Sequence, residues 1–508
     1  MRRFSLFIPA IGLCLFTACS PSAKPGTAAY FAKQLDDPST AITAIGHLAA
    51  LKSTEHADAI AALLRKPGPW QPAAAAALGD LKATQHRGLL LSSIDPSAGT
   101  GSDKRTILAN QLNRNAAKAL AALGDQTAVP MITALLRSPV ATTREGAIEA
   151  LAILGGEGVA QALSDVATND SEPFIQKTAV IALGNLGDPL GVPALIEAMY
   201  RERPGISFYR EARMALVQIG SPAILPLQQT FLRKNTKVEE MRLAEGMPIA
   251  EGTIEAKAGF VLGTLRDQSF EPNMAESLAR IYGHYLQRTK RPVFASVPAS
   301  VVELCFALEN LKQSSKTITL LGRIANEEDI RIREAATHAL TKAHAPDAAK
   351  ILIQAAQNSQ GKAQEVSLAG ASLVAKNENI APLQALIEKS TLTPERRAEF
   401  KAQLDLSIKC ASDISCWQTA AKGSSAAVRE RAVVELALLN QQPDIMAAMQ
   451  DTAPEVRTAA IAALADHVDA VNIQELVKVQ DSWKDKVQFS ANSEEIQYVI
   501  ARAKKLQP

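Results

Sequence analysis

Aromatic residues are scarce in this sequence. Phe, Trp and Tyr make up 4% of its 508 residues, although 47% of the residues are hydrophobic. Compact domains hold about 100–200 residues each, so a globular chain of this length would need roughly three of them. No long linker or shift in composition separates three domains. Alanine and leucine dominate the hydrophobic content, which favours closely packed helices, because alanine is the best helix former.

The sequence has little net charge of either sign. It contains 54 Lys and Arg against 52 Asp and Glu, which gives a formal charge of +2 at pH 7. Only short basic stretches occur, such as those at 201–203 and 504–505. A nearly neutral chain has no bulk electrostatic attraction for DNA, RNA or an acidic membrane surface. We therefore expect no nucleic-acid partner.

Motifs of catalytic and metal-binding sites are also missing. None of the seven histidines is followed by glutamate, and no HExxH motif occurs. The segment 99–106 has a superficial likeness to a phosphate loop, but it lacks the first glycine at the required spacing. We interpret His338 and His344 as a surface residue of a helix and a residue of its turn. The sequence predicts no catalytic residue, no metal ligand and no cofactor.

The N-terminus has the pattern of an export signal. Two arginines precede an apolar run at 4–18, which is too short to span a bilayer and has the length of a signal h-region. Small residues at 17 and 18 precede Cys19, and this arrangement resembles the lipobox of bacterial lipoproteins. The resemblance implies cleavage after residue 18 and attachment of lipid to Cys19. An ordinary signal peptide with a chance cysteine near its end is the alternative.

The residues after Cys19 are consistent with an anchor. Ser, Pro and Gly are frequent at 20–27, as in a flexible tether, and we assign 19–35 to the lipidated N-terminus and tether. Ser20, in place of aspartate, resembles lipoproteins that are sorted to the outer membrane. The resemblance implies a lipid-anchored protein of the cell envelope that faces the periplasm.

The rest of the chain repeats itself. Each repeat opens with a charged or polar residue, continues with alanine and a Leu or Ile pair at helical spacing, and usually ends in Gly or Asp. A second amphipathic segment follows, often with proline in its first turn, where the missing N–H costs nothing. The clearest copies lie at 115–126, 176–189, 333–346 and 456–469, and looser ones at 144–157, 210–222, 257–268 and 428–441.

This pattern, D-x-x-V-R-x-x-A-x-x-A-L-x-x-L-G-D, resembles HEAT repeats, and in particular the bacterial HEAT-like subtype with an LGD turn. The resemblance implies an all-α fold, an α-solenoid in which about twelve antiparallel helix pairs stack into a superhelix. We expect N-terminal repeats at 36–236, an inserted loop at 237–252 and C-terminal repeats at 253–508. A second loop is expected at 92–106. Each of these two loops is either a tolerated surface insertion or a functional loop.

Two cysteines mark a turn between helices. Cys410 and Cys416 flank a polar stretch, and an exported protein meets an oxidising compartment. We therefore predict a disulfide between Cys410 and Cys416, which stabilises by only about 2 kcal/mol because the loop is small. Cys305 lies in an apolar helix and is interpreted as a small buried hydrophobic residue.

Arginines recur near the starts of the repeat helices. One interpretation is that they line a concave face that binds an acidic partner. The other follows from the HEAT resemblance, which implies that each arginine reaches an aspartate of a neighbouring turn and forms a ladder along the stack. The arginines are Arg144, Arg210, Arg213, Arg333, Arg429 and Arg457, and the candidate aspartates are Asp80, Asp125, Asp188, Asp267 and Asp347.

These features favour a non-catalytic scaffold that is tethered to a membrane and binds protein partners along its inner face. One alternative is an envelope enzyme or lyase-like protein with an unrecognised site in a loop. Deoxyhypusine hydroxylases are built on similar repeats, but they bind iron through His-Glu dipeptides, which this chain lacks. Another alternative is a protein that binds glycan or another polymer, for which the tryptophans at 70, 417 and 483 are the candidate stacking residues.

Overall fold

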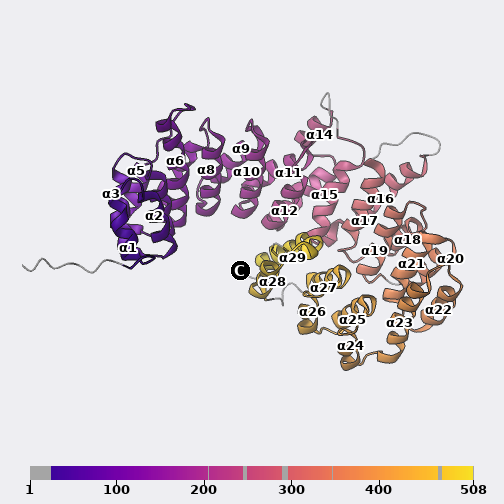
Figure 1. The fold of residues 1–508 in the computed structure, drawn as a ribbon. Coiled ribbons are helices and arrows are strands. Elements are labelled where there is room, and N and C mark those ends of the chain that lie inside the picture. The colour runs from indigo at the N-terminus through magenta and orange to yellow at the C-terminus, as the bar shows by residue number, and fades with distance from the viewer. Residues whose placement is uncertain are drawn as a thin grey trace, which may run out of the picture. The chain divides into compact units, whose positions relative to one another are not determined.

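The structure is a computed structural model that describes residues 24–203, 205–243, 249–288, 296–345, 347–466, 472–484 and 486–506. The expected signal peptide and Cys19 lie outside these residues. The described chain is almost entirely helical and divides into two compact units (Figure 1). Unit 1 ends at Gly156 and unit 2 begins at Glu157. No helix in the described residues is both long and apolar enough to cross a membrane.

Unit 1 consists of short helices joined by tight turns. Its α-helices are α1 (Ala28–Lys33), α2 (Ala41–Ala50), α3 (Ala57–Arg65), α4 (Gln71–Asp80), α5 (Arg87–Ser92), α6 (Lys104–Ala122), α7 (Val129–Leu135) and α8 (Ala141–Leu154). The residues between α5 and α6 form the loop that the sequence predicts at 92–106.

Unit 2 continues the same pattern. Its first α-helices are α9 (Val159–Asn169), α10 (Pro173–Leu186), α11 (Val192–Tyr200), α12 (Tyr209–Ile219), α13 (Ile224–Phe231), α14 (Thr236–Leu243), α15 (Thr253–Thr264), α16 (Glu271–Leu286), α17 (Ser296–Leu308) and α18 (Ser315–Ile324). The α-helices that follow are α19 (Ile330–Lys342), α20 (Ala348–Gln357), α21 (Gly361–Val374), α22 (Ile380–Lys389), α23 (Pro394–Cys410), α24 (Ile414–Ala420), α25 (Ala426–Leu438), α26 (Gln442–Ala448), α27 (Pro454–Asp466), α28 (Ile473–Trp483) and α29 (Ser493–Leu506).

The minor elements lie in the turns. A two-stranded antiparallel ribbon joins α11 to α12, in which β1 (Glu202–Arg203) pairs with β2 (Ile206–Ser207). Most of the 3-10 helices lead into the second helix of a pair. They are η1 (Gln34–Asp36), η2 (Thr54–His56), η3 (Thr84–His86), η4 (Gln126–Ala128), η5 (Pro189–Gly191), η6 (Ser221–Ala223), η7 (Gln268–Phe270), η8 (Asn377–Asn379) and η9 (Val487–Asn492).

The helices of each unit form two rows. In the row that we call inner, each helix packs on the next; in unit 1 this row is α2, α4, α6 and α8, and in unit 2 it is α10, α12, α15, α17, α19, α21, α23, α25, α27 and α29. Each outer helix packs on the inner helix of the pair that follows it, as α11 does on α12 and α20 does on α21. This stacking of helix pairs is an α-solenoid, because each pair buries its apolar face only against its neighbours.

Small residues allow the inner helices to approach closely. A Cβ at Gly79 of α4 would lie 2.7 Å from the Cα of Ala119 on α6. A Cβ at Gly263 of α15 would overlap the backbone carbonyl of Ala307 on α17. Glycine is therefore required where these helices cross, and the alanines around it give the core its density without aromatic rings.

The two units meet between Gly156 and Glu157, within the range expected for the N-terminal repeats. The sequence suggested an interruption at 237–252, but this segment begins inside helix α14, which packs on α11 and so belongs to unit 2. The break falls instead at Gly155, Gly156 and Gly158, whose φ angles are 63°, 111° and 75°. Such positive φ values interrupt the regular turn between two helices, and they are accessible to glycine at little cost.

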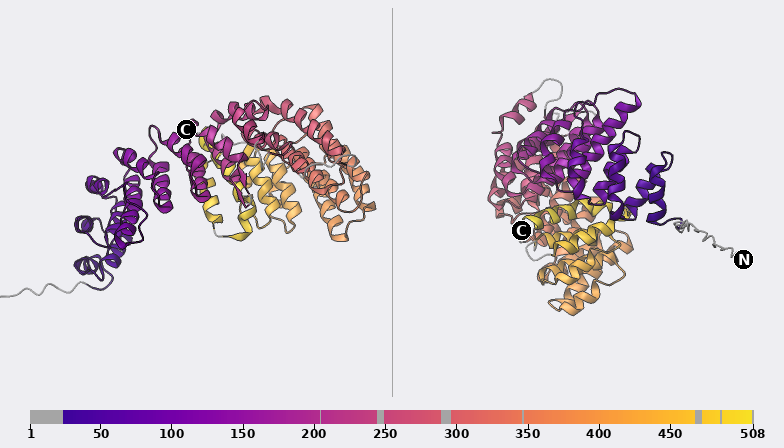
Figure 2. Two further views of the ribbon diagram at one scale, coloured as in Figure 1. Left: turned by 90° about the horizontal axis from the view of Figure 1, so that it is seen from above. Right: turned by 90° about the vertical axis from the view of Figure 1, so that its left-hand side faces the viewer.

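The inner row of unit 2 closes on itself. Its last helix, α29, packs against α12 as well as against α27 and α28. The yellow helices lie next to the magenta ones in the views of Figures 1 and 2. We call the contact between α29 and α12 the seam. It joins residues that are almost 300 positions apart, because Arg210 and Glu494 are separated by 284 residues.

Candidate functional site

Four of the arginines singled out in the sequence hold the turns of the solenoid. Each donates to the backbone carbonyl six residues before it, and each such carbonyl lies just after the preceding outer helix. The pairs are Arg144 with Ser138 (2.9 Å), Arg333 with Glu327 (2.8 Å), Arg429 with Gly423 (3.0 Å) and Arg457 with Asp451 (2.7 Å). Gln176 makes the equivalent bond to Asp170 in a repeat without the arginine (2.8 Å).

These four guanidinium groups do not form the partner-facing surface considered above. Arg144, Arg333 and Arg457 are 8%, 2% and 0% exposed, and Arg429 forms a two-pronged ion pair with Asp451 at 2.7 and 2.8 Å. Arg429 does reach an aspartate of a neighbouring turn, as the ladder interpretation expects, although Asp451 is not among the candidate aspartates. The LGD-type aspartates Asp125 and Asp188 instead accept from backbone N–H groups two residues ahead, which caps η4 and η5.

Arg210 and Arg213 lie at the seam. Both pair with Glu494 of α29, and the Nε of Arg210 is 3.0 Å from a carboxylate oxygen of Glu494. The hydroxyl of Tyr498 also donates to Glu494, at 2.6 Å. The guanidinium of Arg213 lies 5.1 Å from the ring centroid of Tyr209 and 4.8 Å from that of Phe260, which is within cation–π range.

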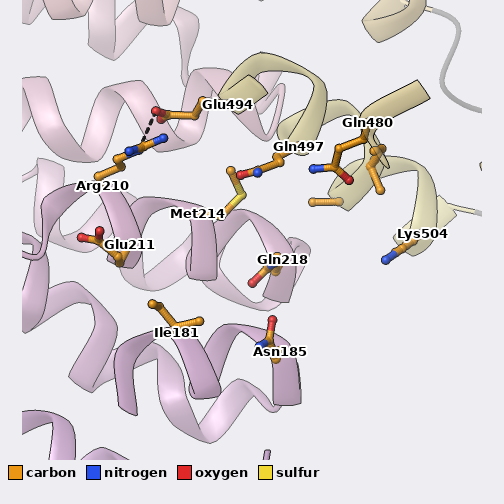
Figure 3. Close-up of a pocket in the computed structure, with 12 residues that line it drawn as sticks. Ile181, Asn185, Arg210, Glu211, Met214, Gln218, Gln480, Glu494, Gln497 and Lys504 are labelled. Atoms are coloured by element: carbon orange, nitrogen blue, oxygen red, sulfur yellow. Dashed lines mark hydrogen bonds and ion pairs between the residues drawn. The ribbon is translucent and has the colours of Figure 1, made fainter. Parts of the chain in front are cut away.

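A cleft opens along this seam (Figure 3). It has a volume of about 410 Å³ and lies between α10 and α12 on one side and α28 and α29 on the other. Ile181, Met214 and Ile500 supply apolar surface. We call this pocket the seam cleft. Its other lining residues are Asn185, Arg210, Glu211, Gln218, Gln480, Glu494, Gln497, Ala501 and Lys504.

The carboxamides are the chemically distinctive part of the seam cleft. Asn185, Gln218, Gln480 and Gln497 come from four different helices and line one pocket, and within the described chain none of their side chains has a hydrogen-bond partner. The carboxamide of the buried Asn113, in contrast, donates to the carbonyl of Asp95 and accepts from the N–H of the same residue, both at 2.7 Å. The cleft therefore offers donors and acceptors that the fold itself does not use.

The charges around the cleft are largely neutralised. Arg210 is paired with Glu494, and Glu211 is paired with Lys177 of α10 at 2.7 Å. Burial opposes ionisation of Glu494, but the Tyr498 hydrogen bond and the Arg213 charge outweigh it and hold its pKa below the usual range. Lys504, at one end of the cleft, is exposed. The site is thus a polar, nearly neutral groove with an apolar floor.

The remaining predicted residues have structural positions. Cys410 and Cys416 form a disulfide with a Cα–Cα distance of 5.3 Å, and the thiol of Cys305 is buried. Two of the three indoles considered as candidates for glycan binding are buried. Trp417 is 1% exposed and Trp483 is 5% exposed and stacked on Phe489.

His338 lies at the surface of α19, as the sequence suggests, and its side chain is 40% exposed. The Nδ1–H of His338 donates to a carboxylate oxygen of Glu309 over 2.6 Å, and Glu309 also pairs with Lys342. In the described part of the chain, no group of three or more His, Cys, Asp or Glu residues is arranged to hold a metal ion.

The carboxamides of the seam cleft were not identified from the sequence. They are spread from residue 185 to residue 497, and nothing in their local neighbourhoods marks them, because polar residues at these helix positions are common on solvated faces. The signal that singles them out is the closure of unit 2, which is a tertiary feature.

Comparison with known proteins agrees with this architecture. A family model described as HEAT repeats matches residues 109–177, and one described as PBS lyase HEAT-like repeat matches residues 175–200. No curated protein matches the sequence. Among solved structures, importin beta, crystallised in a polyethylene glycol condition, is similar with a TM-score of 0.50 and 12% identity, over 92% of this chain and 74% of that chain.

Other solved helical-repeat proteins give lower scores. Importin 13 in its cytosolic state has a TM-score of 0.43 at 12% identity, over 94% of this chain and 73% of that chain. Human deoxyhypusine hydroxylase in complex with glycerol has a TM-score of 0.21 at 17% identity, over 63% of this chain and 99% of that chain. Neither score carries an argument, and the likeness to importin beta shows the fold alone. The chain thus contains HEAT repeats of the two matched families between residues 109 and 200 and folds as an α-solenoid.

Proposed function

We propose that this protein is a non-catalytic interaction scaffold of the bacterial cell envelope, anchored by lipid on Cys19 and facing the periplasm from the outer membrane. Its seam cleft binds an extended segment of a protein partner. The observation that carries this proposal is the set of four carboxamides in one cleft that have no hydrogen-bond partner among the described residues. HEAT-repeat solenoids are scaffolds typical of protein-interaction roles, which supports the protein nature of the partner.

The chemistry of the cleft favours a polypeptide main chain over other ligands. A carboxamide offers both a donor and an acceptor, as does each peptide unit, so several amides along a groove match the repeating N–H and C=O of an extended segment. The apolar floor of Ile181, Met214 and Ile500 suits the side chains that alternate with these groups. No aromatic ring is among the described lining residues, which disfavours stacking of sugars.

The envelope location rests on the N-terminal sequence. The apolar run and the small residues before Cys19 resemble a lipoprotein signal, and the Ser-rich, Pro-rich stretch that follows suits a tether. Mass spectrometry of protein extracted from membranes tests this part directly. We expect an N-terminal peptide that starts at a diacylated Cys19, and a soluble mature protein that starts elsewhere would contradict the anchor.

The partner is tested by affinity capture after crosslinking in intact cells. Wild type is compared with the double variant Gln218→Leu and Gln497→Leu, which removes two of the cleft amides with little change of volume. The matched control is Gln354→Leu and Gln357→Leu on the exposed surface of α20. We expect a protein set that wild type and the control capture and that the cleft variant loses.

The anchor provides a second comparison in the same experiment. Cys19→Ala is expected to lose the partner because the protein no longer reaches the membrane. Capture of the same proteins by the cleft variant and by wild type would contradict a role for the seam cleft, and capture of no protein by wild type would contradict the scaffold itself.

A further inference from the structure

The inner row of unit 2 encloses three pockets that are separate from the seam cleft. The first has a volume of about 250 Å³ and lies between α15, α17 and α19 on one side and α27 and α29 on the other. The second, of about 300 Å³, is lined by α19, α21, α23 and α25, and a narrower one of about 90 Å³ lies between α19, α21, α25 and α27. We call these three the head pocket, the far pocket and the neck. Among the described residues, none that lines them belongs to the seam cleft.

Shared walls join the three pockets into one hollow. His338 of α19 lines all of them. Ala462 of α27 lines both the head pocket and the neck, and Leu373 of α21 lines both the neck and the far pocket. The hollow therefore runs along the inside of the inner row from α15 to α23.

Apolar side chains line this hollow along its length. Phe260 of α15 and Phe306 of α17 are half-buried in the head pocket. Leu373 and Val434 are half-buried in the neck, and Phe400 lines the far pocket. Because the described chain leaves this apolar surface partly open, covering it with an apolar ligand is favourable.

The neck limits the shape of such a ligand. Its volume is less than a third of that of the far pocket. A linear alkyl chain is thin enough for this passage, whereas a polypeptide helix has a diameter of about 10–12 Å with its side chains. The carboxyl of Glu430 lines the neck, and burial raises its pKa to about 7, so this group is uncharged below that pH.

A guanidinium in the head pocket has no carboxylate partner in the described chain. Arg502 of α29 donates to the backbone carbonyl of Ala465 at 3.2 Å. The next residue, Asp466, pairs with Arg266 instead. The remaining N–H groups of Arg502 have no partner among the described residues and are not fully enclosed, so a ligand in the head pocket can reach them.

The carboxylates of the head pocket are already engaged. Glu309 pairs with Lys342 at 2.7 Å. Glu495 accepts from the amide of Asn492 at 3.2 Å, and it lies two helical turns, or about 10 Å, along α29 from Arg502. Arg502 is therefore the charged group that the fold leaves available to a ligand in this pocket.

We propose that the hollow binds a long-chain alkyl carboxylate, with its head group on Arg502 and its chain through the neck. A carboxylate matches the planar donor pair of a guanidinium, which is the reason for choosing this anion. The chain covers the rings of Phe260 and Phe306 and then passes Leu373. A cationic head group is repelled by Arg502, and a neutral one leaves its charge without a counterion. This site does not depend on the function proposed for the seam cleft.

The test is isothermal titration calorimetry of the full mature chain with Cys19→Ala, because the detergent that a lipidated protein requires would itself enter the hollow. Octanoate, decanoate, dodecanoate and tetradecanoate form the series of chain lengths, each below its micelle concentration. Dodecan-1-ol and dodecyltrimethylammonium have the chain of dodecanoate with a neutral and a cationic head group.

Two variants separate the head pocket from the neck. Arg502→Gln removes the charge, and Ala462→Leu places a larger side chain where the head pocket meets the neck. The matched controls are Arg323→Gln on α18 and Ala447→Leu on α26, which lie at exposed positions of outer helices.

We expect dodecanoate to bind the unsubstituted protein and both controls, with affinity that rises about fourfold for each methylene added along the series. Binding of dodecan-1-ol and dodecyltrimethylammonium should be weaker by about tenfold or more. Arg502→Gln should weaken dodecanoate about tenfold and leave dodecan-1-ol unchanged, and Ala462→Leu should weaken tetradecanoate about tenfold.

Three results would overturn the proposal. They are the absence of carboxylate binding, equal affinity for the three head groups, and binding of tetradecanoate that Ala462→Leu leaves unchanged. Circular dichroism shows whether each variant is folded. If Arg502→Gln does not fold, the comparison of head groups on the unsubstituted protein still decides the question. Partner capture through the seam cleft is a separate readout, so each proposal can fail alone.

Discussion

Glu494 holds the seam of unit 2, and its neutralisation is expected to release α29. Its carboxylate binds Arg210, Arg213 and the hydroxyl of Tyr498. Glu494→Gln keeps the size of the side chain and removes the negative charge. The guanidinium of Arg213, whose side chain is 18% exposed, would then lose the carboxylate with which it pairs while it stays among aromatic rings.

The size of the effect follows from the type of bond that is lost. A hydrogen bond to a charged group contributes about 1.5–3 kcal/mol to stability. Because Glu494 and its partners are only partly buried, we take the lower end, about 1.5–2 kcal/mol. Each 1.4 kcal/mol corresponds to a factor of ten in an equilibrium constant, so local opening of α29 should increase by about 10- to 30-fold.

Hydrogen–deuterium exchange measures this opening. Amides of α29 should exchange about 10- to 30-fold faster in Glu494→Gln, while amides of α19 and α21, away from the seam, keep their rates. Glu475→Gln, at an exposed position of α28, is the control and should leave α29 unchanged. Equal exchange of α29 in wild type and Glu494→Gln would refute the view that this carboxylate holds the seam.

Further predictions concern pH, packing and the disulfide. Burial raises the pKa of Glu430 to about 7, so the folded protein binds this proton more tightly than the unfolded chain does. The resulting stabilisation is lost as the pH rises through 7. Glu430→Gln should therefore raise Tm at pH 8, where the gain in unfolding free energy is at most about 3 kcal/mol, and should leave Tm unchanged at pH 4. Thermal melts should show Gly263→Ala destabilised by about 1–3 kcal/mol, since its Cβ meets α17. Gly283→Ala, in the last turn of α16 where a Cβ has open space, should stabilise by at most about 0.5–1 kcal/mol. Ellman titration of the denatured mature protein without reductant should detect the thiol of Cys305 alone, and reduction of Cys410–Cys416 should cost about 2 kcal/mol in a urea melt.

The sequence was sufficient for features that depend on local pattern. The recurring alanine, leucine and glycine spacing predicts helix pairs, and the structure has such pairs throughout unit 1 and unit 2. The same holds for the turn at 410–416, where two cysteines at short separation form the expected disulfide. These inferences succeed because a repeat buries its apolar face against its immediate neighbours, so short-range periodicity determines the packing.

The sequence was not sufficient for features that depend on how far the stack turns. Small rotations between successive pairs add up along unit 2, and their sum brings α29 to α12; no single repeat carries this information. The role of Arg457 was missed for a different reason. A basic residue at a helix start is compatible with a surface position. Only the path of the preceding turn shows that the guanidinium of Arg457 donates a hydrogen bond to a backbone carbonyl.

Site-specific photocrosslinking in intact cells tests the central claim most directly. Benzoylphenylalanine in place of Gln497 puts the photoreactive group in the seam cleft, and the same residue in place of the exposed Lys350 on α20 puts it on the outer row. A scaffold that binds a protein segment in the cleft predicts a discrete, ultraviolet-dependent adduct at position 497 and none at position 350. No protein adduct at 497, or the same adducts at both positions, would contradict the account.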